Sequence, residues 1–360
     1  MFDRLKSILT KPEPAVTADD GPRLNVYATI DPMPARAFPH ITLGEGDRSD
    51  PELSAHLDGF IGYVLSRGDG QMTHTRYHLM RHLQRVQHQV SLRVPHAALP
   101  AFAQWAQSAN AVVFHEDGGV RDPWGRVLID GAGDTDPASV VPHPEDAQQR
   151  KHRSEILLAS RGITVAASLP PLLGQDEVRW QEAGTVTGRL MALLVVSTFA
   201  EGLRENDPVP VEVMQERLPE AFAHLSPKET AFLSAGGEND DLLNAMGWRY
   251  ESLALLAWAV GVVPSLPFPG TICDVPGVCA AVLDAAASGE LASATRRPTG
   301  ELLDALDLHY RIHWAVRDAS LGRRDYPADV IPGVVFERHY ALNWLSRFQD
   351  AAWDDVDTPT

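Results

Sequence analysis

Hydrophobic and polar positions over the first 130 residues follow two different periods. Apolar side chains alternate, or form short apolar runs, in the manner of β-strands at residues 24–30, 111–114 and 126–129. They recur at helical spacing over residues 51–66 and 100–108. Residues 76–94 are ambiguous, because their first half has a helical period and their second half alternates. This mixture predicts a small α+β domain over residues 24–130, packed in two layers.

Stretches without any period divide the chain. Residues 1–23 contain Pro, Asp and Gly and are expected to form a flexible lead-in. Residues 131–145 are rich in Gly, Asp and Pro and are the expected linker to a second domain. Beyond the linker the period becomes helical, with candidate helices at residues 145–161, 177–203, 210–223, 227–234, 240–262, 275–288, 300–321 and 334–349. The predicted fold is therefore α+β overall, with a small N-terminal α+β domain followed by a larger, mostly all-α helical bundle over residues 146–358.

Charge changes the picture of what the chain can bind. The 360 residues carry a formal net charge of -17. Residues 1–150 hold 19 acids and 14 bases, a net of -5, and the remainder holds 29 and 17, a net of -12. Such a surface repels phosphate backbones and anionic lipid, so we expect no nucleic-acid partner and no membrane binding. It suits a basic protein partner, or serves solubility alone.

The two cysteines and the apolar segments indicate the compartment. Cys273 and Cys279 are too few for a disulfide framework or a four-ligand metal site, and no cofactor is predicted. Cys273 precedes a predicted helix, where a thiol can be activated, although a small core residue is the favoured interpretation. The N-terminus shows no signal peptide, and the apolar stretch 253–263 is about half of the ~20 residues that span a bilayer. A cytoplasmic location is expected, and the sequence does not indicate an oligomeric state.

Several motifs of the C-terminal half occur together in a fixed order. They are RSEILL at residues 153–158, GWRYE at 247–251, LAWAVG at 256–261, HWAVRD at 313–318, VFERHYALNW at 335–344 and WDDV at 353–356. Over residues 145–358 this series resembles the bacterial domain-of-unknown-function family numbered 4272, with Val260 in place of the usual Leu. The N-terminal domain resembles nothing recognised. The resemblance implies a family without an assigned activity, so it brings no catalytic residues.

A cluster of polar side chains falls on the last two long predicted helices and on the helix that begins near residue 240. Candidates for acid–base chemistry are Glu251, His313, Arg317, Glu337 and His339, with Arg249, Asp318, Arg338 and Asn343 as candidate ligand-binding residues. In such a set a carboxylate can orient a histidine while arginines bind an anion. Helical bundles also use the same residue types as buried pairs that fix helix register, and this structural interpretation is the favoured one.

Two rows of histidines suggest further sites. His309 and His313 are four residues apart and could share a metal, but Tyr310 stands where zinc enzymes of this helical type carry Glu, so no metal is expected. His74, His78 and His82 line one face if residues 74–85 are helical, and several arginines lie among them. This cationic island could bind an anion, although a solvated face or a contact between domains is the favoured interpretation.

Three functions remain open from the sequence. The leading hypothesis is a non-enzymatic interaction or regulatory module that binds a basic protein. The alternative is a hydrolase-like enzyme with a His/Glu/Arg pocket in the helical domain, and a metal-binding protein is the third. The polar cluster distinguishes the first two, because a catalytic site needs groups that reach solvent while a structural network pairs them in the core.

Overall fold

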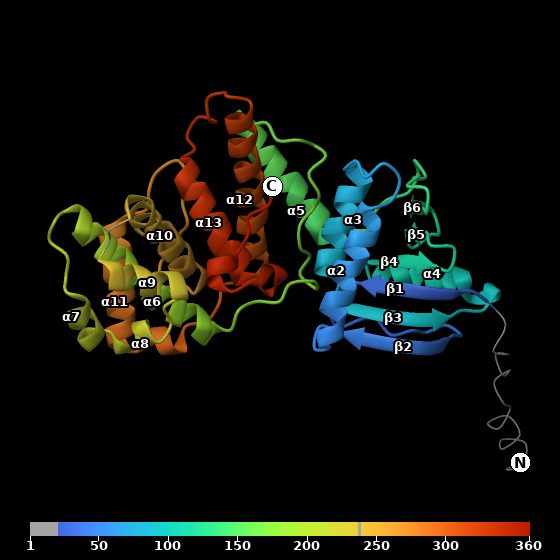
Figure 1. Cartoon of the computed structure of the whole chain (residues 1–360), viewed down its shortest axis with the longest axis horizontal. Helices are drawn as coiled ribbons and strands as arrows, with labels where there is room; N and C mark the ends of the chain where they lie inside the picture. Colours follow the sequence, from blue (N-terminus) through green and yellow to red (C-terminus); the bar gives the residue numbers. More distant parts are fainter. Residues whose placement is uncertain (1–20, 237–238) are drawn as a thin grey trace, which may run out of the picture. The chain divides into compact units, whose positions relative to one another are not determined.

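The computed structural model describes residues 21–236 and 239–360 and divides the chain into two compact units, Met1–Pro144 and Glu145–Thr360 (Figure 1). Most of the predicted lead-in, residues 1–23, lies outside the described residues, and Arg23 already begins the first strand. Residues 131–144, expected to be linker, belong to the first unit, where Val141 is buried in a hydrophobic core.

The first unit contains one antiparallel six-stranded sheet, with the strands in the order β2-β3-β1-β4-β5-β6. The strands are β1 (Arg23–Ala28), β2 (Ile41–Asp47), β3 (His88–Arg93), β4 (Ala111–His115), β5 (Val120–Arg121) and β6 (Val127–Ile129). At the centre of the sheet, Val26 of β1 lies between Val90 of β3 and Val113 of β4. The second half of the ambiguous segment 76–94 is thus a strand, and its first half lies in a helix.

Both faces of this sheet are covered by helices. On one face, Val26 and Val113 pack with Phe102 and Trp105 of α4 (Leu99–Ser108). On the other face, Tyr27 and its neighbours pack against α2 (Pro51–Leu65) and α3 (His74–Arg85). The two-layer prediction was therefore wrong, because the central strands carry apolar side chains on both faces and each face needs its own cover.

The second unit is a bundle of helices, which confirms the predicted α+β class with its large helical part (Figure 1). Its helices are α5 (Glu145–Ser160), α6 (Ala183–Arg204), α7 (Val211–Arg217), α8 (Pro219–Phe222), α9 (Pro227–Ala235), α10 (Asp240–Ala259), α11 (Val275–Ser288), α12 (Thr299–Leu321) and α13 (Pro332–Leu345). The single helix expected over 210–223 is broken into α7 and α8 at Leu218, whose φ of -131° and ψ of 54° are not helical. Leu218 precedes Pro219, and a proline disfavours the helical region for the residue before it.

Helix α10 is the centre of the second unit. It packs against α6 on one side and α13 on another, α13 packs on α12, and α12 packs on α5. The second half of α10 is buried on every side, since Leu253, Leu255, Leu256 and Trp258 are all in the core. This arrangement places α13 in contact with both α10 and α12, and these three helices carry most of the predicted site residues.

One helix among the described residues, α6, is long and apolar enough to cross a bilayer, with a mean hydropathy of 1.4 in its most apolar window. Two-thirds of that window (67%) is buried inside the structure. Such burial is typical of the core helix of a folded domain.

Candidate functional site

The predicted acid–base residues lie where α10, α12 and α13 meet, and most are buried. Exposed fractions are 2% for Glu251, 6% for His313, 4% for Glu337 and 1% for His339. Arg317, by contrast, is exposed on α12. The cluster is therefore an interior feature of the helical unit, and each buried ionisable group in it needs a partner.

Glu251 of α10 is paired through both carboxylate oxygens. Arg338 of α13 donates from Nε to Glu251 Oε2 at 3.0 Å and from Nη1 to the Pro267 carbonyl at 2.6 Å. The backbone N–H of Cys273 donates to Glu251 Oε1 at 2.6 Å. Burial, followed by the charge of Glu251, raises the pKa of the Cys273 thiol to about 12. A thiol with such a pKa is protonated at neutral pH, which argues against a nucleophilic role for Cys273.

Glu337 of α13 forms the second ion pair. Arg249 of α10 donates from Nη1 to Glu337 Oε2 at 3.1 Å, and Ser252 Oγ donates to the same oxygen at 2.6 Å. Burial raises the pKa of Glu337, and the contacts with Arg249 and Ser252 oppose this rise. The Arg249 guanidinium also lies 4.4 Å from the ring centre of Tyr340, a cation–π distance. The two ion pairs thus connect α10 to α13, one through Glu251 and the other through Arg249.

The two central histidines face each other. His313 Nδ1 and His339 Nδ1 are 2.9 Å apart. Because one nitrogen must donate and the other accept, this contact requires that the two Nδ1 atoms share a single proton. Burial, helped by the nearby Arg317, lowers the pKa of His313 to about 4, so this imidazole is neutral at pH 7.

The remaining candidates have separate partners. Asp318 pairs with Arg324 in a short surface contact, and Asn343 Nδ2 donates to the Asp357 carbonyl at 2.8 Å. His309 uses Nδ1 on the Ala305 carbonyl at 2.8 Å. Within residues 21–236 and 239–360, no three His, Cys, Asp or Glu side chains lie close enough together to hold a metal ion. The structure therefore brings together three pairs, Glu251–Arg338, Glu337–Arg249 and His313–His339.

Two further buried ion pairs of the same unit were not predicted from the sequence. Arg311 contacts both carboxylate oxygens of Asp307, at 2.9 and 2.8 Å, and its four-residue helical spacing from Asp307 could have indicated the pair. Arg189 of α6 pairs with Glu229 of α9 at 2.9 Å. No sequence spacing joins these two residues, because the contact depends on how α6 and α9 pack.

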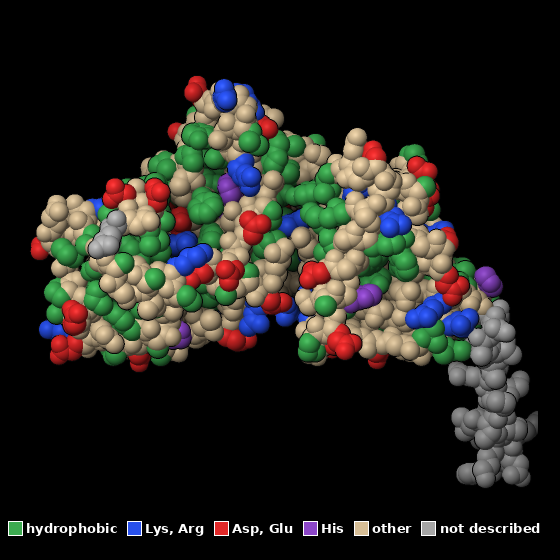
Figure 2. Space-filling model, viewed as in Figure 1, with side chains coloured by type: hydrophobic (Ala, Val, Ile, Leu, Met, Phe, Trp, Pro, Cys, Tyr) green, Lys and Arg blue, Asp and Glu red, His purple; other side chains and the backbone are tan. Residues whose placement is uncertain are grey.

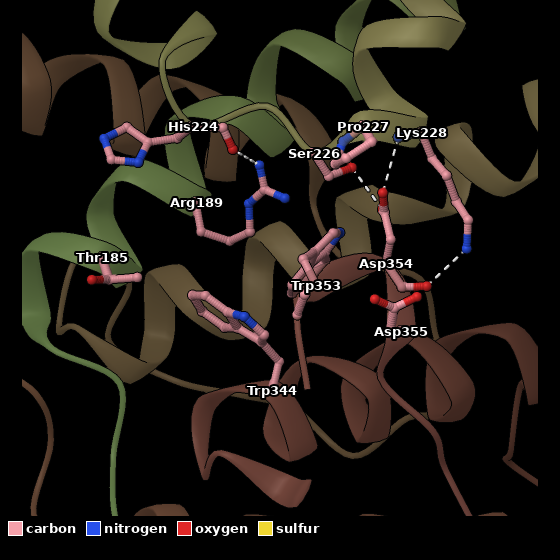
Figure 3. Close-up of a pocket in the computed structure, with 11 residues that line it drawn as sticks. Thr185, Arg189, His224, Ser226, Pro227, Lys228, Trp344, Trp353, Asp354 and Asp355 are labelled. Atoms are coloured by element: carbon pink, nitrogen blue, oxygen red, sulfur yellow. Dashed lines mark hydrogen bonds between the residues drawn. The ribbon is translucent and has the colours of Figure 1, made fainter. Parts of the chain in front are cut away.

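A cavity of about 460 Å³ is lined in part by Arg189, the arginine that pairs with Glu229 (Figure 3). Figure 3 shows the ring of Trp353 next to Arg189, which lies 5.0 Å from the ring centre, with Trp344 below. Asp354 accepts from Ser226 Oγ at 2.6 Å and from the Lys228 backbone N–H at 2.9 Å, so it caps the N-terminus of α9. The polar side chains of this cavity thus mainly hold α6, α9 and the C-terminal segment together.

The histidine row of the first unit was expected to be a solvated face or a contact between domains, and the solvated face holds only for His74, which is exposed. His78 and His82 are buried, and His82 Nε2 lies 3.2 Å from the Tyr27 carbonyl. Burial, with a contribution from Arg85, lowers the pKa of His82 to about 3. Arg76 is also buried and donates to the Gln71 and Arg67 carbonyls. His82 and Arg76 therefore tie α3 into the core of its own unit.

The second unit is therefore a helical bundle whose apolar core contains buried ion pairs between helices. The chain belongs to the DUF4272 family, a domain of unknown function whose family model matches residues 150–356. No curated protein and no solved structure matches the chain. The motifs behind the resemblance, at residues 247–251 and 335–344, supply both members of the Glu251–Arg338 and Glu337–Arg249 pairs.

Proposed function

We propose that this protein is an interaction module that binds a basic protein segment, and that its polar cluster holds the helices together. The observation that carries the proposal is the pairing of both carboxylates: Glu251 and Glu337 are buried, and each is held by an arginine of the facing helix. A general acid or base must reach the proton that it transfers, within hydrogen-bond distance or through one water. The paired carboxylates favour the structural interpretation over a hydrolase-like site built on the same residues.

An acidic surface on the helical unit supports a basic partner. Residues 204–220, which include α7 and α8, contain five acids and two bases. Met214 alone in this stretch is buried. Figure 2 shows acidic side chains at this end of the helical unit, around α7. The local charge would steer a basic segment toward the surface and raise its rate of association.

The same surface carries apolar side chains that a partner could cover. Val209 and Val213 are 42% and 43% exposed, and Val213 lies on α7 between the acids Glu212 and Glu216. Exposed valines surrounded by acidic side chains fit a partner segment that carries both leucine and lysine, because leucine can cover the valines while lysine pairs with the acids. We call residues 204–220 the acidic surface below.

The test is a binding titration with a fluorescent 15-residue peptide of lysine and leucine. The full chain should bind the peptide, with an affinity that falls as salt rises, because exposed charges are screened. Replacing Glu212 and Glu216 by lysine should weaken binding by about tenfold or more, since several charge contacts become repulsive.

The control is an equal change of charge elsewhere. Asp58→Lys with Asp134→Lys alters two exposed acids of the first unit and leaves the same net charge as the test variant. Binding should stay within about twofold of the unmodified chain, because rim charges far from an interface act only through a screened field. Equal weakening by both variants, or no binding at low salt, would overturn the proposal.

A further inference from the structure

A second cavity, of about 480 Å³, lies between α5, α12 and the segment at residues 266–269. Its volume falls within the range of small-molecule sites. The apolar part of the lining includes Leu157, Trp258, Leu266, Pro267, Phe268 and Leu308. Pro267 is also the residue whose carbonyl accepts from Arg338, so a member of the buried network forms part of the wall.

His309 lines this cavity and has one ring nitrogen without a partner. Its Nδ1 lies 2.8 Å from the Ala305 carbonyl, which can only accept, so Nδ1 carries the hydrogen. The side chain is 2% exposed, and burial, followed by the charge of Arg338, lowers its pKa to about 3. The imidazole is therefore neutral, and Nε2 offers a lone pair. Among the described residues no group donates to this nitrogen.

Among the charged residues that line the cavity, one arginine has no acidic partner. Asp304 is held by Arg150 at 3.1 Å and by Arg153 at 2.7 Å. Glu301 pairs with Arg297 at 3.3 Å. The guanidinium of Arg161 lies 4.0 Å from the centre of the Phe268 ring and makes no ion pair within residues 21–236 and 239–360. The cavity thus combines a buried acceptor, aromatic walls and the exposed guanidinium of Arg161, which has no acidic partner among the described residues.

We propose that this cavity binds a small organic anion with a flat apolar body. Its hydroxyl or N–H group donates to His309 Nε2, its body packs against Trp258 and Phe268, and its carboxylate pairs with Arg161. A buried acceptor without a donor is unfavourable, so a ligand that supplies the donor gains that free energy on binding. The inference is independent of the acidic surface, which involves none of these residues.

The test uses three probes of matched shape, titrated into the full chain. They are 4-hydroxyphenylacetate, phenylacetate, which lacks the donor, and 2-(4-hydroxyphenyl)ethanol, which lacks the carboxylate. For a ligand of this size the first should bind with a Kd of about 1 mM or below. Loss of the hydroxyl should weaken binding about fivefold, and loss of the carboxylate about tenfold.

Variants and a spectroscopic readout connect the binding to these residues. Arg161→Gln should remove the advantage of the acid over the alcohol, whereas Arg323→Gln, at an exposed arginine of the same unit outside the cavity, should preserve it. Binding should also shift the ¹⁵N resonance of the unprotonated ring nitrogen of His309, since that atom receives the hydrogen bond. Absence of binding by 4-hydroxyphenylacetate, equal affinity for all three probes, or an unchanged preference in Arg161→Gln would each overturn the proposal.

Discussion

At the scale of single residues, most of the buried charged side chains of the second unit are in ion pairs. Arg338 is fully buried and contacts both Glu251 and the Pro267 carbonyl. A buried ion pair adds little net stability compared with a well-packed apolar pair, but removing one partner strands the other charge in the core. The expected effect of a substitution therefore depends on whether one or both members change.

Arg338→Met should lower the free energy of unfolding by about 3–5 kcal/mol, because Glu251 remains buried without its partner. Denaturant unfolding followed by tryptophan fluorescence measures the loss. Changing both residues, Arg338→Met with Glu251→Leu, should restore most of it. The control Arg324→Met breaks the exposed pair with Asp318 and should cost about 1 kcal/mol or less. A loss in Arg338→Met no larger than in this control would contradict the account.

Stability should depend on pH through the histidine pair. The pKa of His313 is about 4 in the folded chain, against about 6.5 in an unfolded one. Between these values the unfolded chain binds the extra proton, so the free energy of unfolding falls as pH falls from about 6.5 to 4 and is unaffected by this group above that range. The loss from His313 alone should be about 2 kcal/mol by pH 5.

The measurement compares denaturant unfolding at pH 7.5 and pH 5 for the unmodified chain and for His313→Gln. The variant should be less stable at pH 7.5, since the contact with His339 is changed, but should lose less on acidification. Equal losses in the two proteins would show that His313 is not the group that titrates.

At the scale of elements, the short helix α9 depends on its N-terminal cap. Ser226 accepts from the Glu229 backbone N–H while Glu229 accepts from the Ser226 backbone N–H, and Asp354 accepts from the Lys228 backbone N–H. These contacts satisfy N–H groups that the first turn of a helix leaves free. They also tie the C-terminal segment to α9, on the wall of the cavity in Figure 3.

Ser226→Ala should lower the free energy of unfolding by about 1–2 kcal/mol, since both the cap and the hydroxyl contact with Asp354 are lost. Ser234→Ala is the matched control, because Ser234 is an exposed serine of the same helix whose hydroxyl bonds only to the Thr230 carbonyl. It should change stability by less than about 0.5 kcal/mol. Similar losses in the two variants would argue against the capping role.

Elements whose hydrophobic positions follow a clear helical or strand period could be predicted from the sequence. Elements that depend on tertiary contacts could not. The helical period located α10, α12 and α13 closely, as well as β1 and β4. Strand β2 was missed because it is mostly exposed and its sequence, ITLGEGD, has no buried alternate face. Part of the predicted polar cluster lies together, whereas Arg317 is exposed and Asp318 pairs at the surface. Only the packing of α10 on α13 shows that Glu251 pairs with Arg338 and Glu337 with Arg249.

At the scale of the whole molecule, each unit has its own core, and residues 131–144 bear on where one ends. Val141 of this stretch is buried with residues of α2 and α3. Produced alone, residues 21–144 should fold cooperatively, whereas residues 21–130 should lose about 2 kcal/mol or more, because a buried valine and the contacts around it are removed. Circular dichroism during thermal unfolding measures both fragments. Equal stability would place the boundary at the earlier position.

The most direct test of the account asks whether the buried cluster or the acidic surface makes the binding site. Glu251→Leu with Arg338→Met removes a charged pair from the core, and its fold is checked by near-ultraviolet circular dichroism. The lysine–leucine peptide is then titrated into this variant under low salt. The Kd should stay within about twofold of that of the unmodified chain, because the effects of changes at groups that do not touch are additive. A variant that keeps its fold but loses the peptide would show that the cluster is a site after all.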